Sequence, residues 1–237
     1  MKTGRRALLS GSASGLILVA SGAWGAAPRW EASGPPVAVM PGPWLFFSPE
    51  EGAAIEALVD ILIPPDPKTP GGKDAGVAVF IDRQLSGPYG TSVGLYMRPP
   101  FAEGTAQQGA QSPLTPAMRY RQSLAALDRY CHAAFAGKSF REIPDKRATA
   151  LLRDIEKNAI QFEGISAKAF FEILLRNTKE GFFADPIYGG NRDRVAWTMI
   201  GFPGARYDYR DWIDRHNETY PLPAVGITGR PAWTRAK

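Results

Sequence analysis

The sequence predicts an all-α fold: a single loop-rich helical domain with an extended linker before it and a tail after it. Apolar residues recur at helical spacing in several separate stretches after residue 47. Sustained alternation of apolar and polar residues, which would indicate strands, does not occur. The 237 residues suffice for one well-buried domain, and the 25 glycines and 21 prolines indicate long connections between its helices.

The first two helices are predicted on the N-terminal side of the domain. Ser48 has the features of an N-cap, because Pro49 suits the first helical position and Glu51 completes a capping box. This helix should end at the prolines of positions 64 and 65. A second helix is expected over residues 74–85. The apolar positions of the two helices are Ile55, Leu58, Val59 and Leu62, then Val77, Phe80, Ile81 and Leu85.

Three further helices follow along the chain. One should begin at Thr115 and Pro116 and run to about Phe135, another lies around residues 148–155, and a third begins after a Ser166 cap. Their expected buried residues are Leu124, Leu127 and Cys131, then Ala148, Leu151, Leu152 and Ile155, and finally Phe170, Phe171, Leu174 and Leu175. The helical domain is therefore expected to occupy residues 47–206.

The two ends of the chain differ from this domain in composition. Residues 1–27 are typical of an export signal, and the adjacent Arg5 and Arg6 favour the twin-arginine route; a Sec signal or an uncleaved anchor are the alternatives. Residues 28–46 are proline-rich and predict an extended linker. Residues 207–237 form an aromatic and then Pro/Gly-rich tail. Three interpretations of this tail stay open: it wraps a partner, it lies as a strap over its own domain, or it is disordered beyond Pro221.

Charge and cysteine content exclude several classes of function. Removing Lys2, Arg5 and Arg6 with the leader lowers the formal charge from +5 to about +2, too little to indicate nucleic-acid binding. The single cysteine, Cys131, cannot support an iron–sulfur cluster or a covalent c-type haem. Cys131 is expected to be a buried structural thiol, with a disulfide to another subunit as the alternative.

Residues 181–204 combine aromatic residues, glycine and charge without a helical or strand period. A loop of this length inside a compact domain usually has a function, and rigid aromatic groups beside fixed polar groups suit a contact surface. The expected contact residues are Phe182, Phe183, Asp185, Tyr188, Asn191, Arg192 and Trp197. Two other interpretations stay open: the loop packs on its own domain, or it forms a catalytic cleft with Asp185, Tyr188 and Arg192.

Local chemistry within this loop gives finer predictions. Asp185, which precedes a proline, should cap or fasten the turn that follows it, and residues 189–191 should supply positive backbone dihedral angles. Arg192 should pair either with a carboxylate of a partner or with Asp193 or Asp185 of its own loop. The chain has no GxGxxG stretch, phosphate-binding loop or metal-ligand pattern, so neither a cofactor nor a metal is expected on it.

Several stretches resemble the small chain, subunit 3, of membrane-bound gluconate 2-dehydrogenase and of related FAD-dependent fructose, sorbitol and glucose dehydrogenases. The resemblance spans about residues 47–204 and includes residues 181–204 themselves. The other stretches are LVDILIPPD at 58–66, DAGVAVFID at 74–82, QQGAQSPLTP at 107–116, YRQSLAALD at 120–128 and FFEILLRNTKEGFFADP at 170–186.

The resemblance implies a non-catalytic small subunit in the periplasm. FAD would lie on a large glucose-methanol-choline-type partner subunit, haem c on a cytochrome c subunit, and membrane association would come through the complex. The leader of the small chain would carry the folded large subunit through the twin-arginine translocase. A self-contained periplasmic carbohydrate-active enzyme and a free-standing binding module that use residues 181–204 remain the alternatives.

Overall fold

The computed structural model describes residues 38–102, 104–108, 111–206 and 208–229. Within these ranges the regular structure is helical, apart from two isolated bridges between Phe162 and Ile165 and between Gly204 and Val225. The prediction of an all-α fold is confirmed.

The α-helices are α2 (Pro49–Leu62), α3 (Val77–Ser86), α4 (Pro116–Ala134), α5 (Asp145–Glu156), α6 (Ala167–Phe183) and α7 (Val195–Met199). Short 3₁₀ turns are η1 (Ala106–Gln108), η2 (Phe140–Glu142), η3 (Pro186–Tyr188), η4 (Arg192–Arg194) and η5 (Arg210–Trp212).

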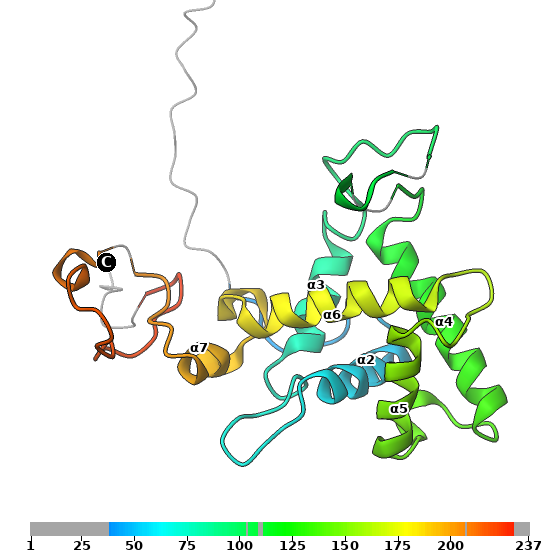
Figure 1. Ribbon diagram of the computed structural model, residues 1–237, viewed down its shortest axis with the longest axis horizontal. Coiled ribbons are helices and arrows are strands. Elements are labelled where there is room, and N and C mark those ends of the chain that lie inside the picture. Colours follow the sequence, from blue (N-terminus) through cyan, green and yellow to red (C-terminus); the bar gives the residue numbers. More distant parts are fainter. Residues whose placement is uncertain (1–37, 103, 109–110, 207, 230–237) are drawn as a thin grey trace, which may run out of the picture. The chain divides into compact units, whose positions relative to one another are not determined.

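Helix α6 lies at the centre of this arrangement and packs against α2, α3, α4, α5 and α7 (Figure 1). Its apolar face contributes Phe170 and Leu174 to the core, which also includes Ile55 and Leu58 of α2 and Leu127 of α4. These side chains are almost fully removed from water. Burial of apolar area is the main force that holds such helices together.

The capping predictions hold at three helix starts. Ser48 and Glu51 form the reciprocal capping box of α2, and the hydroxyl groups of Thr115 and Ser166 accept the N–H groups of Met118 and Ala169. The start of α3 differs from the prediction, because Gly76 has a left-handed φ of 79° and delays the helix to Val77. The residues between Gly71 and Gly76 form hydrogen-bonded turns instead.

A buried carboxylate attaches the segment before α2 to helix α3. Asp82 has no exposed surface and accepts the backbone N–H groups of Leu45, Phe46 and Phe47 at 2.9, 2.9 and 3.0 Å. The guanidinium of Arg83 pairs with the same carboxylate. One side chain therefore accepts three backbone N–H groups at the edge of the core.

A hydrogen-bonded cluster fixes α6 against α4 and against the segment that follows α3. The hydroxyls of Tyr120 and Tyr89 donate to the side-chain oxygen of Asn177 on α6 at 3.0 and 3.2 Å. Burial raises the pKa of Tyr120 well above its usual value, so its hydroxyl stays neutral and can donate. This cluster holds the helix that leads into residues 181–204.

Candidate partner-binding site

Residues 181–204 are more regular than the sequence predicts. Helix α6 continues to Phe183, and η3, η4 and α7 occupy most of the remainder. The prediction of a long loop without helical structure is therefore wrong. Each of these helical pieces is short, from three to five residues, which is too little sequence for a period to be recognised.

Asp185 fastens the turn after α6, as its position before a proline predicts. One carboxylate oxygen accepts the N–H of Ile187 at 3.0 Å. The other oxygen accepts the N–H of Ile227 at 2.6 Å, so the same side chain also holds the C-terminal tail. The chain before α2 reaches this turn as well, because the N–H of Val39 donates to the carbonyl of Ile187 at 2.8 Å.

Positive φ angles occur where the sequence suggests them, with one exception. Gly189 and Asn191 have φ angles of 94° and 45°. Gly190 is not in this conformation, and it is needed for a different reason. A Cβ atom at Gly190 would lie 2.1 Å from the carbonyl oxygen of Gly181, so only glycine lets the turn pack this closely on α6.

Three of the expected contact residues are buried within the chain itself. Phe182 and Trp197 are 2% and 6% exposed, and Asn191 is fully buried. The indole N–H of Trp197 donates to the carbonyl of Phe183 at 2.8 Å, and the amide of Asn191 bonds to Ala184 and Ala196 at 2.8 and 2.9 Å. These side chains hold residues 181–204 on the domain, and almost all of their surface is removed from solvent.

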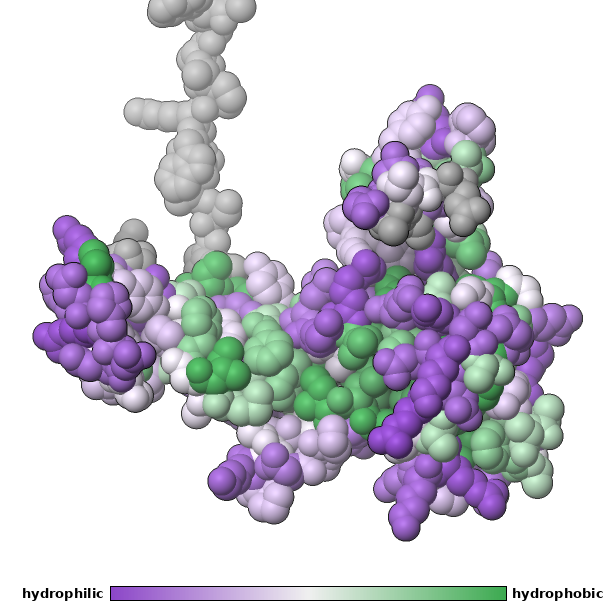
Figure 2. Space-filling view, in the orientation of Figure 1, coloured by the Kyte–Doolittle hydropathy of each residue, from purple (hydrophilic) through white to green (hydrophobic). Residues whose placement is uncertain are grey.

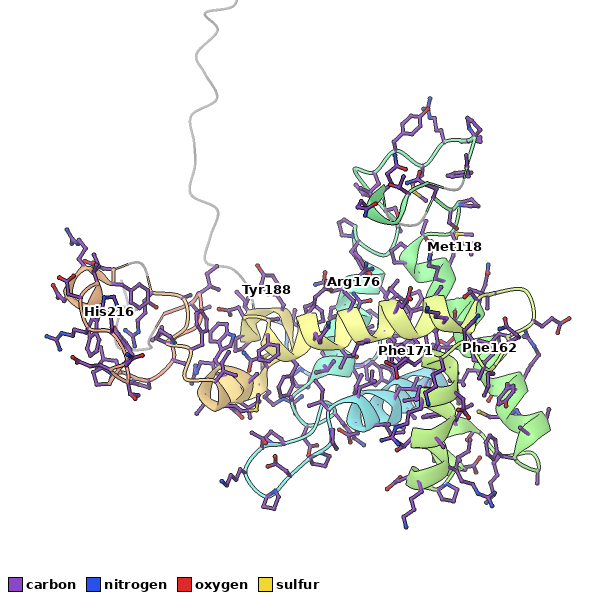
Figure 3. The ribbon with its side chains drawn as sticks, in the orientation of Figure 1. Met118, Phe162, Phe171, Arg176, Tyr188 and His216 are labelled. Carbon is purple, nitrogen blue, oxygen red and sulfur yellow. The ribbon has the colours of Figure 1, made fainter. Side chains whose placement is uncertain are left out.

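The exposed surface of this segment is formed by their neighbours. Phe183 is 42% exposed and Tyr188 49% exposed, and Figure 3 shows Tyr188 beside the C-terminal end of α6. Arg192 is also exposed, and among the described residues it forms no salt bridge, either with Asp185 or with Asp193.

Sequence reasoning missed two exposed aliphatic residues at the end of the segment, Met199 and Ile200, which lie close in sequence to the aromatic Phe202. Met199, Ile200 and Phe202 are 50%, 58% and 44% exposed. Figure 2 shows hydrophobic residues gathered over α7 and the adjoining end of α6. We call the exposed residues Phe183, Tyr188, Arg192, Met199, Ile200 and Phe202 the contact surface. Clustered exposed apolar groups of this kind commonly mark protein–protein interaction sites.

The arrangement does not assemble the catalytic cleft considered from the sequence. A cleft of about 770 Å³ beside this segment includes Arg192 and Asp193, but neither Asp185 nor Tyr188 lines it. Both oxygens of Asp185 already accept backbone N–H groups. Across the described part of the chain, His, Cys, Asp and Glu side chains form no cluster of three or more that could hold a metal ion.

Cys131 lies in the core on α4, with no exposed surface. Burial raises the pKa of its thiol to about 12. Of the two interpretations of this residue, burial favours the structural thiol, because a disulfide with another subunit would require the sulfur to reach the surface. The adjacent His132 faces solvent and pairs with Asp128 at 3.2 Å.

We expect the thiol of Cys131 to resist iodoacetamide at pH 8 in the native protein and to react fully in guanidinium chloride. The reason is that the reactive thiolate is both inaccessible and disfavoured in the folded state. The free energy of unfolding should also fall as the pH rises above about 9, since the Cys131 thiol then loses its proton in the unfolded chain and retains it in the folded chain. Rapid labelling under native conditions, measured by mass spectrometry, would contradict this placement.

Arg5 and Arg6 lie outside the described residues. In the part of the chain that the structure describes, no helix has both the length and the apolar character needed to cross a bilayer.

A comparison with protein families finds that residues 49–204 match the gluconate 2-dehydrogenase subunit 3 family. The match begins at the first residue of α2 and ends at Gly204, just after the contact surface. No curated protein and no solved structure matches the chain.

Proposed function

Since this chain belongs to the gluconate 2-dehydrogenase subunit 3 family, we propose that it is the non-catalytic small subunit of a periplasmic FAD-dependent dehydrogenase complex that oxidises a sugar or sugar acid. The observation that carries this proposal is the family match over residues 49–204, which includes every described α-helix. FAD would be held by a large glucose-methanol-choline-type subunit, and electrons would leave through a cytochrome c subunit that carries haem c.

The contact surface supports a role in assembly. It places aromatic and aliphatic side chains beside an exposed arginine that has no ion pair among the described residues, a combination favoured in protein–protein interfaces. A small subunit that binds only the folded flavoprotein stabilises that fold by mass action. If one leader exports both chains, the pair would have to assemble before translocation. The partner would then acquire its FAD in the cytoplasm, before export.

Co-purification tests this proposal directly. An affinity tag on residue 237 of the full chain should retain a larger protein with the absorbance spectrum of bound FAD, together with dye-coupled oxidation of a sugar or sugar acid. The small chain alone should show neither the spectrum nor the activity. Sugar oxidation by the isolated chain would instead support the alternative of a self-contained enzyme.

Export should depend on the two adjacent arginines of the leader. The twin-arginine receptor reads the arginine pair, whereas a Sec signal tolerates lysine. We therefore expect Arg5→Lys with Arg6→Lys to leave both this chain and the flavoprotein in the cytoplasm, as measured by immunoblotting of periplasmic fractions. Replacing Lys2 by Arg is the matched control and should leave export unchanged. Normal periplasmic accumulation of the double variant would exclude the twin-arginine route.

A further inference from the structure

A groove without charged side chains lies between α7 and the C-terminal tail. Its volume is about 340 Å³. Trp197, Phe202 and Pro203 line one side, and Tyr220, Leu222 and Pro223 line the other. None of the residues that line the groove is charged.

Both walls of the groove are held in place by contacts of their own. Trp197 and Phe202 pack edge to face with ring centroids 5.2 Å apart, and the indole N–H of Trp197 is already bonded to Phe183. On the other wall, Tyr220 packs against Trp212 with ring centroids 4.9 Å apart, and the guanidinium of Arg206 lies 5.1 Å from the centroid of the Tyr220 ring. A groove with fixed walls loses little entropy when it binds a partner.

The tail that forms the second wall is closed back onto the helical domain. Gly204 and Val225 form a parallel bridge, and the N–H of Ala205 donates to the carbonyl of Val225 at 2.7 Å. Val225 is 2% exposed. Further along, the bond from Ile227 to Asp185 ties the tail to the turn after α6. The tail is therefore attached to the helical domain at Val225 and Ile227, directly after the residues that line the groove.

The two walls differ in their relation to the family. Trp197, Phe202 and Pro203 lie within the matched residues 49–204, whereas Tyr220, Leu222 and Pro223 lie beyond them. One wall is therefore part of the family domain, and the other is added by the tail. A surface built in this way can combine a shared mode of contact with selection of one particular partner.

We infer that this groove receives one bulky uncharged side chain, aliphatic or aromatic, from the large flavoprotein subunit, and that the tail selects that subunit. The inference rests on the proposed function, which supplies the partner. A charged group would lose its hydration in a groove without charged residues, so an apolar side chain is the complementary occupant. Phe202 belongs to both the groove and the contact surface, which makes the groove continuous with that surface.

The test compares two exposed leucine-sized residues of the tail. Leu222 is 47% exposed and lines the groove, whereas Ile213 is 65% exposed and does not. The FAD-containing subunit obtained by co-purification is separated and titrated against the full chain by calorimetry. We expect Leu222→Ala to weaken binding on the order of tenfold and Ile213→Ala to change it less than twofold.

A second variant blocks the groove without removing a wall. Thr198 is exposed and lines the groove, so Thr198→Trp should fill part of it and weaken binding on the order of tenfold. Melting temperatures should stay close to that of the unmodified chain, because both Leu222 and Thr198 are exposed.

The possible results separate this inference from the proposed function. If the unmodified chain fails to bind any flavoprotein, the proposed function is wrong and the inference falls with it. If the unmodified chain binds but Leu222→Ala and Thr198→Trp bind equally well, the inference alone is overturned. A homodimer of this chain that Leu222→Ala dissociates would also overturn it, since the groove would then hold a second copy.

Discussion

Replacing Asp82 by alanine is expected to lower the free energy of unfolding by about 3 to 5 kcal/mol. The variant would leave the N–H groups of Leu45, Phe46 and Phe47 without their acceptor and Arg83 without its carboxylate. For a domain of this size, such a loss corresponds to a fall of roughly 10 °C in the melting temperature. Calorimetry or circular dichroism of the purified variant provides the measurement.

Two further variants make the Asp82 experiment specific. Asp82→Asn keeps one acceptor oxygen and removes the charge. Its free energy of unfolding should therefore lie between that of the unmodified chain and that of Asp82→Ala. Asp154→Ala removes an exposed carboxylate from α5 and should change the free energy of unfolding by less than about 0.5 kcal/mol. Equal stability of Asp82→Ala and Asp154→Ala would show that the three backbone bonds contribute nothing to the fold.

Phe182→Ala and Tyr188→Ala should have opposite consequences although the two aromatic residues lie six positions apart. Phe182 is 2% exposed, so its truncation creates a cavity and should cost about 3 to 5 kcal/mol of stability. Tyr188 is 49% exposed, so its truncation should leave the melting temperature unchanged. If Tyr188 contacts the flavoprotein, the same truncation should cost about 2 kcal/mol of binding, roughly thirtyfold in affinity.

Melting temperature and affinity for the flavoprotein must be measured on the same preparations. Trp197→Ala serves as a check, because Trp197 is also buried and its truncation should also lower the melting temperature. A Tyr188→Ala variant with unchanged melting temperature and unchanged affinity would remove Tyr188 from the contact surface. Weakened binding by fully folded Phe182→Ala would show that Phe182 reaches the partner after all.

Helix starts could be predicted from the sequence because their chemistry is local. Ser48 and Glu51 lie three residues apart, and each satisfies a backbone N–H of the other. The N-caps of α4 and α6 could be predicted for the same reason. The start of α3 was misplaced because the left-handed conformation of Gly76 is set by close packing: a Cβ atom there would lie 2.5 Å from the carbonyl oxygen of Gly189. That contact joins residues far apart in the sequence.

The burial of Phe182 could have been predicted, whereas the position of the tail could not. Leu174, Thr178 and Phe182 are spaced four residues apart, so extending α6 by one turn would have placed Phe182 on its buried face. No comparable local signal links Asp185 to Ile227, which are 42 positions apart. The groove depends on that link and on the bridge between Gly204 and Val225, so it becomes visible only in three dimensions.

The turn from Asp185 to Ile187 also has a mechanical consequence. It holds Val39 on one side and Ile227 on the other. A force applied between residues 38 and 229 would therefore act first on two hydrogen bonds at a single surface turn. Those two hydrogen bonds would bear the load before the helical core does. Tension from either direction along the chain would peel away the end segments before it began to unfold the helices.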